Sequence, residues 1–172
     1  MPTKSKAASK HLNDLFLDTL KDIYYAEKQI LRALPKMARA ADSDALRKAF
    51  EDHRVQTQGQ IERLDEVFEI LAKRAQGKTC EAILGIIEEG KGIIEEFDGS
   101  PALDAGLISA AQAVEHYEIA RYGTLKAWAE KLGMPDVAKL LDASLEEEKA
   151  TDELLTKVAE TAVNAEAMAE AA

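Results

Sequence analysis

The stretch LISAAQAVEHYEIARYGTLKAW, residues 107–128, is the most informative part of the chain for its fold. Its apolar side chains recur every three or four positions, which is the spacing of one face of an α-helix. Two glutamates, Glu115 and Glu118, interrupt that face near its middle. The stretch therefore predicts a long helix that packs against other helices and carries two carboxylates into the space between them.

Three further segments have the same helical spacing of apolar residues over a comparable length. They predict helices over about residues 11–41, 44–76 and 135–160, in addition to the one that follows Ser100. Helices of this length are each about 40 Å long at 1.5 Å per residue. A shorter helix, diluted by glycine, is expected over residues 79–97.

Capping residues indicate where these helices begin and end. Asp42-Ser43-Asp44 separates the first two helices and supplies an N-cap, and Thr79 and Ser100 are the expected N-caps further on. Pro101 is suited to the first helical position after Ser100. Gly133-Met134-Pro135 is expected to end the helix that follows Ser100 and to open the last helix in the same manner.

The connections predict the topology. Short links join the first helix to the second and the fourth to the fifth, so each pair should form an antiparallel hairpin, while residues 77–100 are long enough to cross the bundle from end to end. This is the all-α, ferritin-like four-helix bundle with a short fifth helix in the long crossover. We expect the bundle over residues 11–161, a disordered basic tail over 1–10 and a frayed Ala/Glu tail over 162–172.

Composition excludes several classes of function. The 172 residues are 47% hydrophobic and 31% charged, which suits one folded domain, and the net charge of −10 argues against nucleic acid and membranes as partners. No apolar run is long enough to span a bilayer, and no secretory h-region follows the first lysines. The single cysteine, Cys80, cannot form an internal disulfide, and we expect a cytoplasmic protein.

Each long helix has polar residues in the middle of its expected buried face. They are Glu27 on the first helix, His53, Thr57 and Gln60 on the second, Glu115 and Glu118 on the fourth, and Glu148 with either Thr151 or Asp152 on the fifth. The internal repeat of the two hairpins supports this alignment, because an offset of 91 residues relates Glu27 to Glu118 as well as several apolar pairs.

Buried carboxylates at these positions need a partner. Moving an ionised carboxylate into a dry core costs several kcal/mol, and neighbouring carboxylates repel one another. If Asp152 is included, the five acidic residues carry −5, which two divalent cations would offset by +4. Oxygen ligands with one imidazole suit iron or manganese, and zinc is a further candidate. The alternative is that all four faces are displaced by one residue, so that these side chains lie in water.

Three motifs resemble the bacterial YciE/YciF stress-protein family: Tyr24-Tyr25-Ala26-Glu27-Lys28-Gln29, Val114-Glu115-His116-Tyr117-Glu118-Ile119-Ala120 and Leu145-Glu146-Glu147-Glu148-Lys149-Ala150-Thr151-Asp152. The resemblance covers about residues 11–160 and implies a ferritin-like fold, related in architecture to rubrerythrins. In rubrerythrin-type sites one helix supplies two glutamates three apart, and the next supplies a glutamate and a second ligand four residues on. Glu115/Glu118 and Glu148/Asp152 match this spacing, with aspartate in place of the usual histidine.

Together these observations predict a set of metal ligands and a set of weaker or outer residues. The expected ligands are Glu27, His53, Glu115, Glu118, Glu148 and Asp152, and the weaker or outer residues are Gln56, Gln60, His116, Tyr24 and Tyr122. A core histidine bonded to a carboxylate is the alternative for His53. His116 lies about 100° around the helix from Glu115, so it is not expected to bind the metal directly. The two tyrosines are candidates to hydrogen-bond ligands, with aromatic packing as the alternative.

The second helix departs from the family pattern. Such sites place a glutamate and a histidine there, whereas this chain has Gln56 and Gln60, with His53 one turn earlier. Glutamine ligates through its carbonyl oxygen but brings no charge. One of the two metal positions is therefore expected to be weaker, and a mononuclear site is an alternative.

The predicted function is that of a stress-associated di-metal carboxylate protein, with iron as the expected metal, that oxidises Fe(II) or reduces O₂ or peroxide. Whether it turns over as an oxidoreductase is left open, because an external electron donor would be needed: the chain has no cysteines for the second iron centre of rubrerythrins. The alternative is a non-enzymatic structural or interaction protein whose metal site is mononuclear, structural or vestigial. A homodimer is expected from the resemblance and the apolar crossover helix.

Overall fold

The computed structural model describes residues 9–169, and nearly all of them are helical. The main helices are α1 (Leu12–Ala40), α2 (Asp44–Ile70), α3 (Glu81–Glu96), α4 (Leu103–Lys131) and α5 (Pro135–Val158). A π-helical segment, η1 (Ala159–Val163), and a short helix, α6 (Asn164–Ala169), follow. There is no strand between residues 9 and 169. No helix in this part of the chain is both long and apolar enough to cross a membrane.

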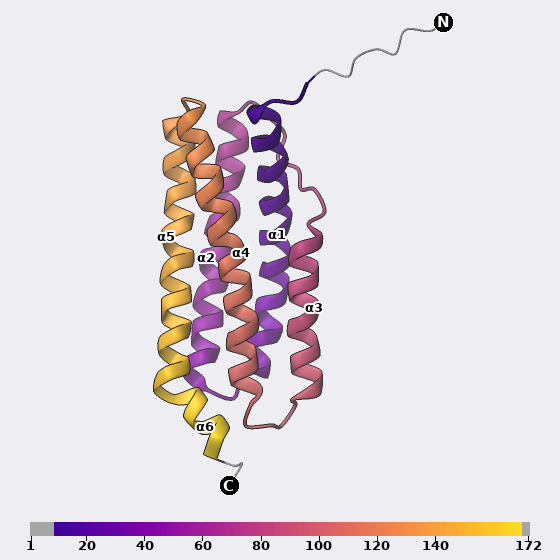
Figure 1. Cartoon of the computed structure of the whole chain (residues 1–172), viewed down its shortest axis with the longest axis vertical. Helices are drawn as coiled ribbons and strands as arrows, with labels where there is room; N and C mark the ends of the chain where they lie inside the picture. The colour runs from indigo at the N-terminus through magenta and orange to yellow at the C-terminus, as the bar shows by residue number, and fades with distance from the viewer. Residues whose placement is uncertain (1–8, 170–172) are drawn as a thin grey trace, which may run out of the picture.

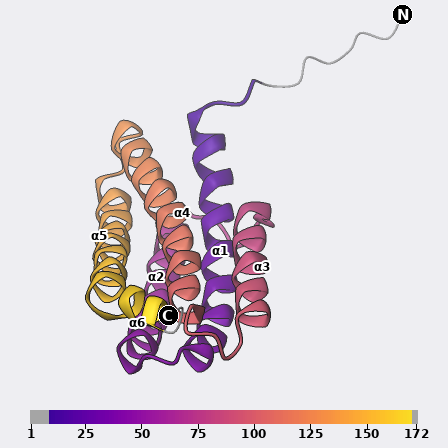
Figure 2. The same cartoon turned by 60° about the horizontal axis from the view of Figure 1, so that its bottom comes forward.

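The four long helices form two hairpins that pack side by side. α1 packs on α2 and α4 packs on α5, and the hairpins meet where α1 contacts α4 and α2 contacts α5. The connection leaves α2 at one end of the bundle and returns to α4 at the opposite end, with α3 along the side (Figure 1). The turned view places α3 at the edge, beside α1 (Figure 2). The predicted all-α architecture with one long crossover is confirmed.

The hydrophobic core runs along the whole bundle axis and is made by all four long helices. Burying each large apolar side chain contributes about 1.5–3 kcal/mol, and the largest fully buried side chains are Tyr122, Phe50, Phe68, Leu20, Ile23, Leu46, Leu64, Ile83, Leu107, Leu125, Leu141 and Leu155. Most of these residues lie on the faces that the apolar spacing predicts. The register of each long helix is therefore as expected.

Two helix ends agree with the predicted capping residues. The Ser43 hydroxyl accepts a hydrogen bond from a backbone N–H of the first turn of α2. At the end of α4, Gly133 has a φ of 74°, the Met134 N–H donates to the Ala129 carbonyl, and Pro135 opens α5. Only a residue that tolerates positive φ closes a helix in this way, which is why glycine stands there.

α2 is shorter than predicted, because it ends at Ile70 and not near residue 76. The next residues form the same kind of closing turn, with Ala72 at a φ of 50° and the Lys73 N–H donating to the Phe68 carbonyl. The polar residues that follow have no apolar face to pack. The expected helical extension therefore has nothing to stabilise it.

Two predicted N-caps are also wrong. α3 is capped by Cys80, whose sulfur accepts a backbone hydrogen bond, and not by Thr79. α4 begins at Leu103, two residues after Pro101, because Ser100 first closes a separate turn with its own hydroxyl and carbonyl. Both errors concern backbone conformation within one turn, where several short polar residues compete as caps.

The predicted tails have different outcomes. Residues 1–8 of the expected disordered tail lie outside the described residues. In the expected frayed tail, residues 162–169 are the end of η1 and α6, and fraying of these helical turns stays a prediction. Val163 is buried against the hydrophobic core, and this apolar contact gives the segment a place to pack.

α3 is attached to the bundle differently from the other helices. Only Ile83 and Gly90 among its 16 residues are buried, and it packs mainly against α4 and α1. It packs tightly at Gly106 of α4, where a Cβ atom would lie 2.6 Å from a methyl carbon of Ile93. α3 is therefore an outer wall whose remaining aliphatic side chains are only partly covered.

Candidate metal centre

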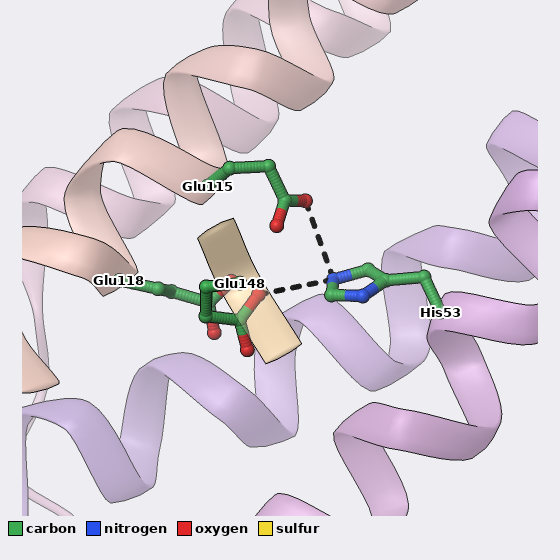
Figure 3. A group of neighbouring side chains, drawn as sticks. All are labelled: His53, Glu115, Glu118 and Glu148. Atoms are coloured by element: carbon green, nitrogen blue, oxygen red, sulfur yellow. Dashed lines mark ion pairs between the residues drawn. The ribbon is translucent and has the colours of Figure 1, made fainter. Parts of the chain in front are cut away.

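Four buried polar side chains meet in the middle of the bundle. They are His53 from α2, Glu115 and Glu118 from α4, and Glu148 from α5. One ligand atom of each lies within 4.8 Å of the others, and no member is more than 2% exposed. Figure 3 shows the imidazole and the carboxylates turned toward one another. We call these four residues the central cluster.

Local sequence explains how each helix presents its members. Glu115 and Glu118 are three residues apart and therefore lie on one face of α4, between the buried Ala111 and Tyr122. Because apolar residues on both sides fix the rotation of the helix, the glutamates have no way to reach water. Glu148 is held in the same way between buried residues of α5.

The imidazole of His53 lies across from the carboxylates. Its Nε2 atom is 3.3 Å from Glu115 Oε1 and 3.8 Å from Glu148 Oε2. Its Nδ1 atom lies 3.4 Å from Gln56 Oε1 and 3.5 Å from the Thr151 hydroxyl. A partner on Nδ1 orients the ring and leaves Nε2 directed at the cluster, which is the arrangement of metal-binding histidines.

Many polar atoms around this point have no hydrogen-bond partner within the described part of the chain. They are Glu27 Oε2, His53 Nε2, Gln60 Oε1, Glu115 Oε2, both carboxylate oxygens of Glu118, and Glu148 Oε2. Native proteins leave few buried polar groups unpaired, and each costs about 1–3 kcal/mol. Carboxylate oxygens and one imidazole nitrogen around a single point are the ligands that iron, manganese and zinc take. The residues present therefore fit a metal ion.

Burial also controls the protonation of the cluster. Burial, together with the nearby Glu27 and Asp152 carboxylates, raises the pKa of Glu115 to about 8. Burial and neighbouring carboxylates raise the pKa values of Glu118 and Glu148 well above their ordinary range. Burial lowers the pKa of His53 to about 4. Without a cation, burial therefore favours protonated carboxyls and a neutral imidazole at neutral pH.

Glu27, an expected ligand, lies beside the central cluster and not within it. It is fully buried, interacts with the Glu118 carboxylate and accepts a hydrogen bond from the Tyr122 hydroxyl. Burial and the nearby Glu148 raise its pKa well above the ordinary value. Of the two roles considered for Tyr122, hydrogen bonding to a carboxylate and aromatic packing, the structure shows a direct hydrogen bond to Glu27.

The two glutamines on α2 also border the cluster without joining it. Gln60 is buried, and its amide nitrogen donates to Glu148 and, at 3.1 Å, to Glu147. Gln56 accepts from the Thr151 hydroxyl at 3.3 Å and contacts the outer nitrogen of His53. Each glutamine thus holds a cluster residue in position.

Three residues singled out in the sequence, Asp152, His116 and Tyr24, are not members of the central cluster. Asp152, an expected ligand, accepts from Gln112 at 3.1 Å and lies 3.3 Å from the imidazole of His116, which is 70% exposed. Tyr24 donates to Asp65 and contacts no cluster residue by hydrogen bond. Thr151, three residues after Glu148, is buried, whereas Asp152, four residues after it, is only partly buried.

Arg63 was not singled out in the sequence. Its guanidinium pairs with Glu147 and donates to the Ser144 hydroxyl at 3.0 Å. Its positive charge favours the ionised form of Glu27. The sequence feature that could have identified Arg63 is its spacing of three residues from Gln60, which places it at the edge of the same helical face.

Comparison with known proteins agrees with the fold and with the sequence resemblance. The model of the family described as "Domain of unknown function (DUF892)" matches residues 11–168. The protein YciF of Escherichia coli (strain K12) is 49% identical over 159 residues, which cover 92% of this chain and 96% of YciF.

Solved structures extend the comparison to three dimensions. The crystal structure of the E. coli stress protein YciF matches with a TM-score of 0.86 at 49% identity, covering 91% of this chain and 99% of that one. YcfI from Rhodopseudomonas palustris, described as a candidate structural protein, matches with a TM-score of 0.84 at 46% identity, covering 89% and 98%. The predicted ferritin-like bundle is thereby confirmed, and the chain belongs to the DUF892 family, that of YciF.

Proposed function

We propose that the central cluster binds divalent iron or manganese and that the protein is a stress-associated metal–carboxylate protein acting on O₂ or peroxide. The observation that carries this proposal is the convergence of unpaired, buried carboxylate oxygens and an imidazole nitrogen from three helices. The link to stress rests on YciF, which is described as a stress protein.

The first metal position would be held by the four members of the cluster. His53 supplies a neutral nitrogen, and three glutamates supply oxygen ligands with more negative charge than one divalent ion cancels. The surplus charge favours a second ion beside the first. Metal binding would also release the protons that the raised pKa values keep on the carboxyls.

The second position would lie on the α1 side. Glu27 offers an unpaired oxygen there, Glu118 lies between it and the first position, and Gln60 has an unpaired carbonyl oxygen. With Asp152 outside the site, the four buried glutamates carry −4, which two divalent ions balance. Because Gln60 brings no charge, this position should be the weaker one.

When bound, iron would supply the one-electron redox chemistry toward O₂ or peroxide, and the chain supplies the geometry of the ligands. Tyr122 holds one oxygen of Glu27, Gln60 holds one oxygen of Glu148, and Gln56 orients His53. The hydrophobic core packs around them. Turnover requires an external electron donor, and a homodimer remains part of the proposal.

A second candidate function is that of a structural protein in which the metal serves stability alone. The amide of Gln60 favours it, because a neutral donor to Glu148 stands where a charged ligand would complete a reactive pair of metals. The description of YcfI as a candidate structural protein points the same way.

Peroxide consumption by Fe(II)-loaded protein distinguishes the two candidates. We expect stoichiometric iron oxidation, followed by turnover when a chemical reductant is supplied, and loss of both in Glu118→Ala/Glu148→Ala. The matched control is Glu130→Ala/Glu153→Ala, which removes exposed glutamates from the same two helices. If peroxide oxidises the bound Fe(II) no faster than free Fe(II), the redox function is excluded and the structural function stands.

A further inference from the structure

A cavity of about 480 Å³ lies between α1, α3 and α4 and reaches the central cluster. His53 and Glu115 line its inner end, and Arg32, Lys36 and Lys91 line it where it opens. This volume is in the range of pockets that hold small organic ligands. The cavity therefore connects the proposed metal position with the surface.

The walls of the cavity are apolar. They are formed mainly by Ile30, Leu34 and Met37 of α1, Ile87 and Ile94 of α3, and Val114 of α4. Small residues also line it, among them Ala33, Gly90 and Ala110, and they leave the space that larger side chains would fill. A ligand that fits here must be apolar along most of its length.

The inner end of the cavity carries polar atoms that lack a partner. Neither Nε2 of His53 nor Oε2 of Glu115 has a hydrogen-bond partner among the described residues, and both residues are at least 98% buried. A ligand that fills the cavity would thus end beside atoms assigned to the metal. Because its inner end reaches the buried residues His53 and Glu115, the cavity is deeper than a shallow surface groove.

The outer end is positively charged although the chain as a whole carries −10. Arg32 and Lys36 are exposed, lie one turn apart on α1, and form no ion pair with any described residue. Lys91 is paired with Glu88 at 2.6 Å, so these two charges cancel. Two free cations at the mouth of an apolar cavity suit a ligand with an anionic head.

The α3 wall is the part of the molecule best suited to move aside for a ligand. Gly85 and Gly92 would meet nothing within 4 Å if they carried a Cβ atom, so packing does not require glycine at either place. Interior glycines weaken a helix, and α3 buries only two residues. A weakly held wall allows entry without disturbing the four long helices.

We infer that this cavity binds a fatty-acid-like amphiphile, an unbranched apolar chain with a carboxylate head. The head pairs with Arg32 and Lys36, and the far end of the chain lies beside His53 and Glu115. The assignment of that end to the neighbourhood of a metal rests on the proposed function, whereas binding of the amphiphile does not require the metal.

Equilibrium dialysis with labelled decanoate tests the binding. We expect one saturable site per chain, weakened about tenfold or more by Ala33→Phe, which places a ring in the cavity. The matched control is Ala40→Phe, which changes a half-buried alanine of the same helix outside the cavity and should leave the affinity unchanged. Circular dichroism melts of both variants establish that they fold.

The charge of the head is tested separately. Arg32→Glu/Lys36→Glu should weaken decanoate about tenfold and leave decan-1-ol unchanged, while Lys131→Glu/Lys139→Glu, an equal charge reversal at exposed sites on α4 and α5, should change neither. Equal binding of decanoate to all variants, or no saturable binding to the wild type, would overturn the inference. So would a homodimer that Ala33→Phe dissociates, because the cavity would then be a contact between copies.

The orientation is tested with Mn²⁺-loaded protein by NMR. Mn²⁺ should broaden the terminal methyl signal of decanoate more than the signal of the methylene next to the carboxylate. The reverse order would contradict the assigned orientation. If the protein binds no Mn²⁺ while decanoate still binds in dialysis, the proposed metal function fails and the cavity assignment stands.

Discussion

The two hairpins of the bundle present equivalent faces to the interior but very different charge. The α4–α5 hairpin contributes three buried glutamates, whereas the α1–α2 hairpin contributes Glu27 and His53. At the offset of 91 residues that pairs Glu27 with Glu118, Tyr24 corresponds to Glu115 and Thr57 to Glu148. The duplicated scaffold therefore carries a complete set of acidic ligands on one side only.

The first hairpin uses the corresponding positions for its own structure. The Tyr24 hydroxyl donates to Asp65 at 2.6 Å, and the Thr57 hydroxyl donates to the His53 carbonyl at 2.9 Å. Each hydroxyl thus donates its proton within the first hairpin, and neither residue belongs to the central cluster. The difference teaches that metal affinity should depend mostly on the second hairpin, with the first hairpin deciding whether a second ion binds.

The largest expected effect comes from the second hairpin. Glu118→Ala/Glu148→Ala should weaken Mn²⁺ binding by about 100-fold or more, because it removes two of the three charged ligands of the first position. Isothermal titration calorimetry measures the loss. Glu130→Ala/Glu153→Ala should bind like the wild type, and an equal loss there would assign the affinity to general surface charge.

The next effect is the response of the metal-free protein to pH. Glu115 has a pKa of about 8 in the folded protein against an ordinary 4.5, so the stability that its proton provides at low pH is lost as pH rises toward 8. His53 has the opposite sign, but its contribution changes only between its folded pKa of about 4 and its ordinary 6.5. From pH 6.5 to 8 Glu115 by itself should lower the free energy of unfolding by about 2 kcal/mol.

Thermal unfolding at pH 6.5 and pH 8 measures this change. The metal-free protein should melt several degrees lower at pH 8. Protein saturated with Mn²⁺ should not, because the cation already holds the carboxylates ionised. Glu115→Gln should reduce the decline, and a metal-free wild type that becomes more stable over this range would contradict the assigned carboxyl pKa values.

Changing the first hairpin should affect the second ion alone. Glu27→Gln keeps the side-chain shape and an oxygen for the Tyr122 hydroxyl, but removes the charge. We expect metal content to fall from two ions per chain to one, with the affinity of the remaining ion within about threefold of the wild type. Loss of both ions would mean that Glu27 belongs to the first position.

Making the hairpins more alike should have the reverse effect. Gln60→Glu adds a carboxylate to the first hairpin, next to Glu148 of the second hairpin. This change should increase the affinity for the second ion by about tenfold. The same change should destabilise the metal-free protein, since it adds a buried acid and removes a hydrogen-bond donor. Weaker metal binding would show instead that the amide of Gln60 is needed to position Glu148.

The smallest effect is expected at Asp152. Asp152→Asn should change Mn²⁺ affinity by less than about twofold, because this side chain is partly exposed and already bonded to Gln112. Thr151→Ala, one residue away on the inward face, is the informative companion, as it removes a hydroxyl beside His53. A tenfold loss in Asp152→Asn would show that the aspartate turns inward when metal binds.

Apolar spacing was sufficient to predict the four long helices and the faces they bury, because each helix has enough large apolar residues to fix its rotation. The boundaries were less predictable. Ala72 adopts a left-handed conformation, and Cys80 takes the capping position that Thr79 was expected to fill. These choices depend on backbone geometry within one turn, to which several sequences are equally suited.

The burial of Glu27, His53, Glu115, Glu118 and Glu148 followed from the same faces, whereas their role as metal ligands stays a prediction. The carboxylate of Asp152 accepts from Gln112 and lies beside His116, and these side-chain contacts do not follow from the spacing of four from Glu148. The cavity beside the cluster could not be predicted, since it depends on how α3 lies on α1 and α4.

Anomalous X-ray diffraction from crystals loaded with Mn²⁺ or Fe²⁺ tests the metal centre most directly. We expect the strongest peak among His53, Glu115, Glu118 and Glu148, and a weaker one beside Glu27. Peaks at surface carboxylates alone, or no peak in a cluster whose side chains are well ordered, would contradict the proposed metal centre.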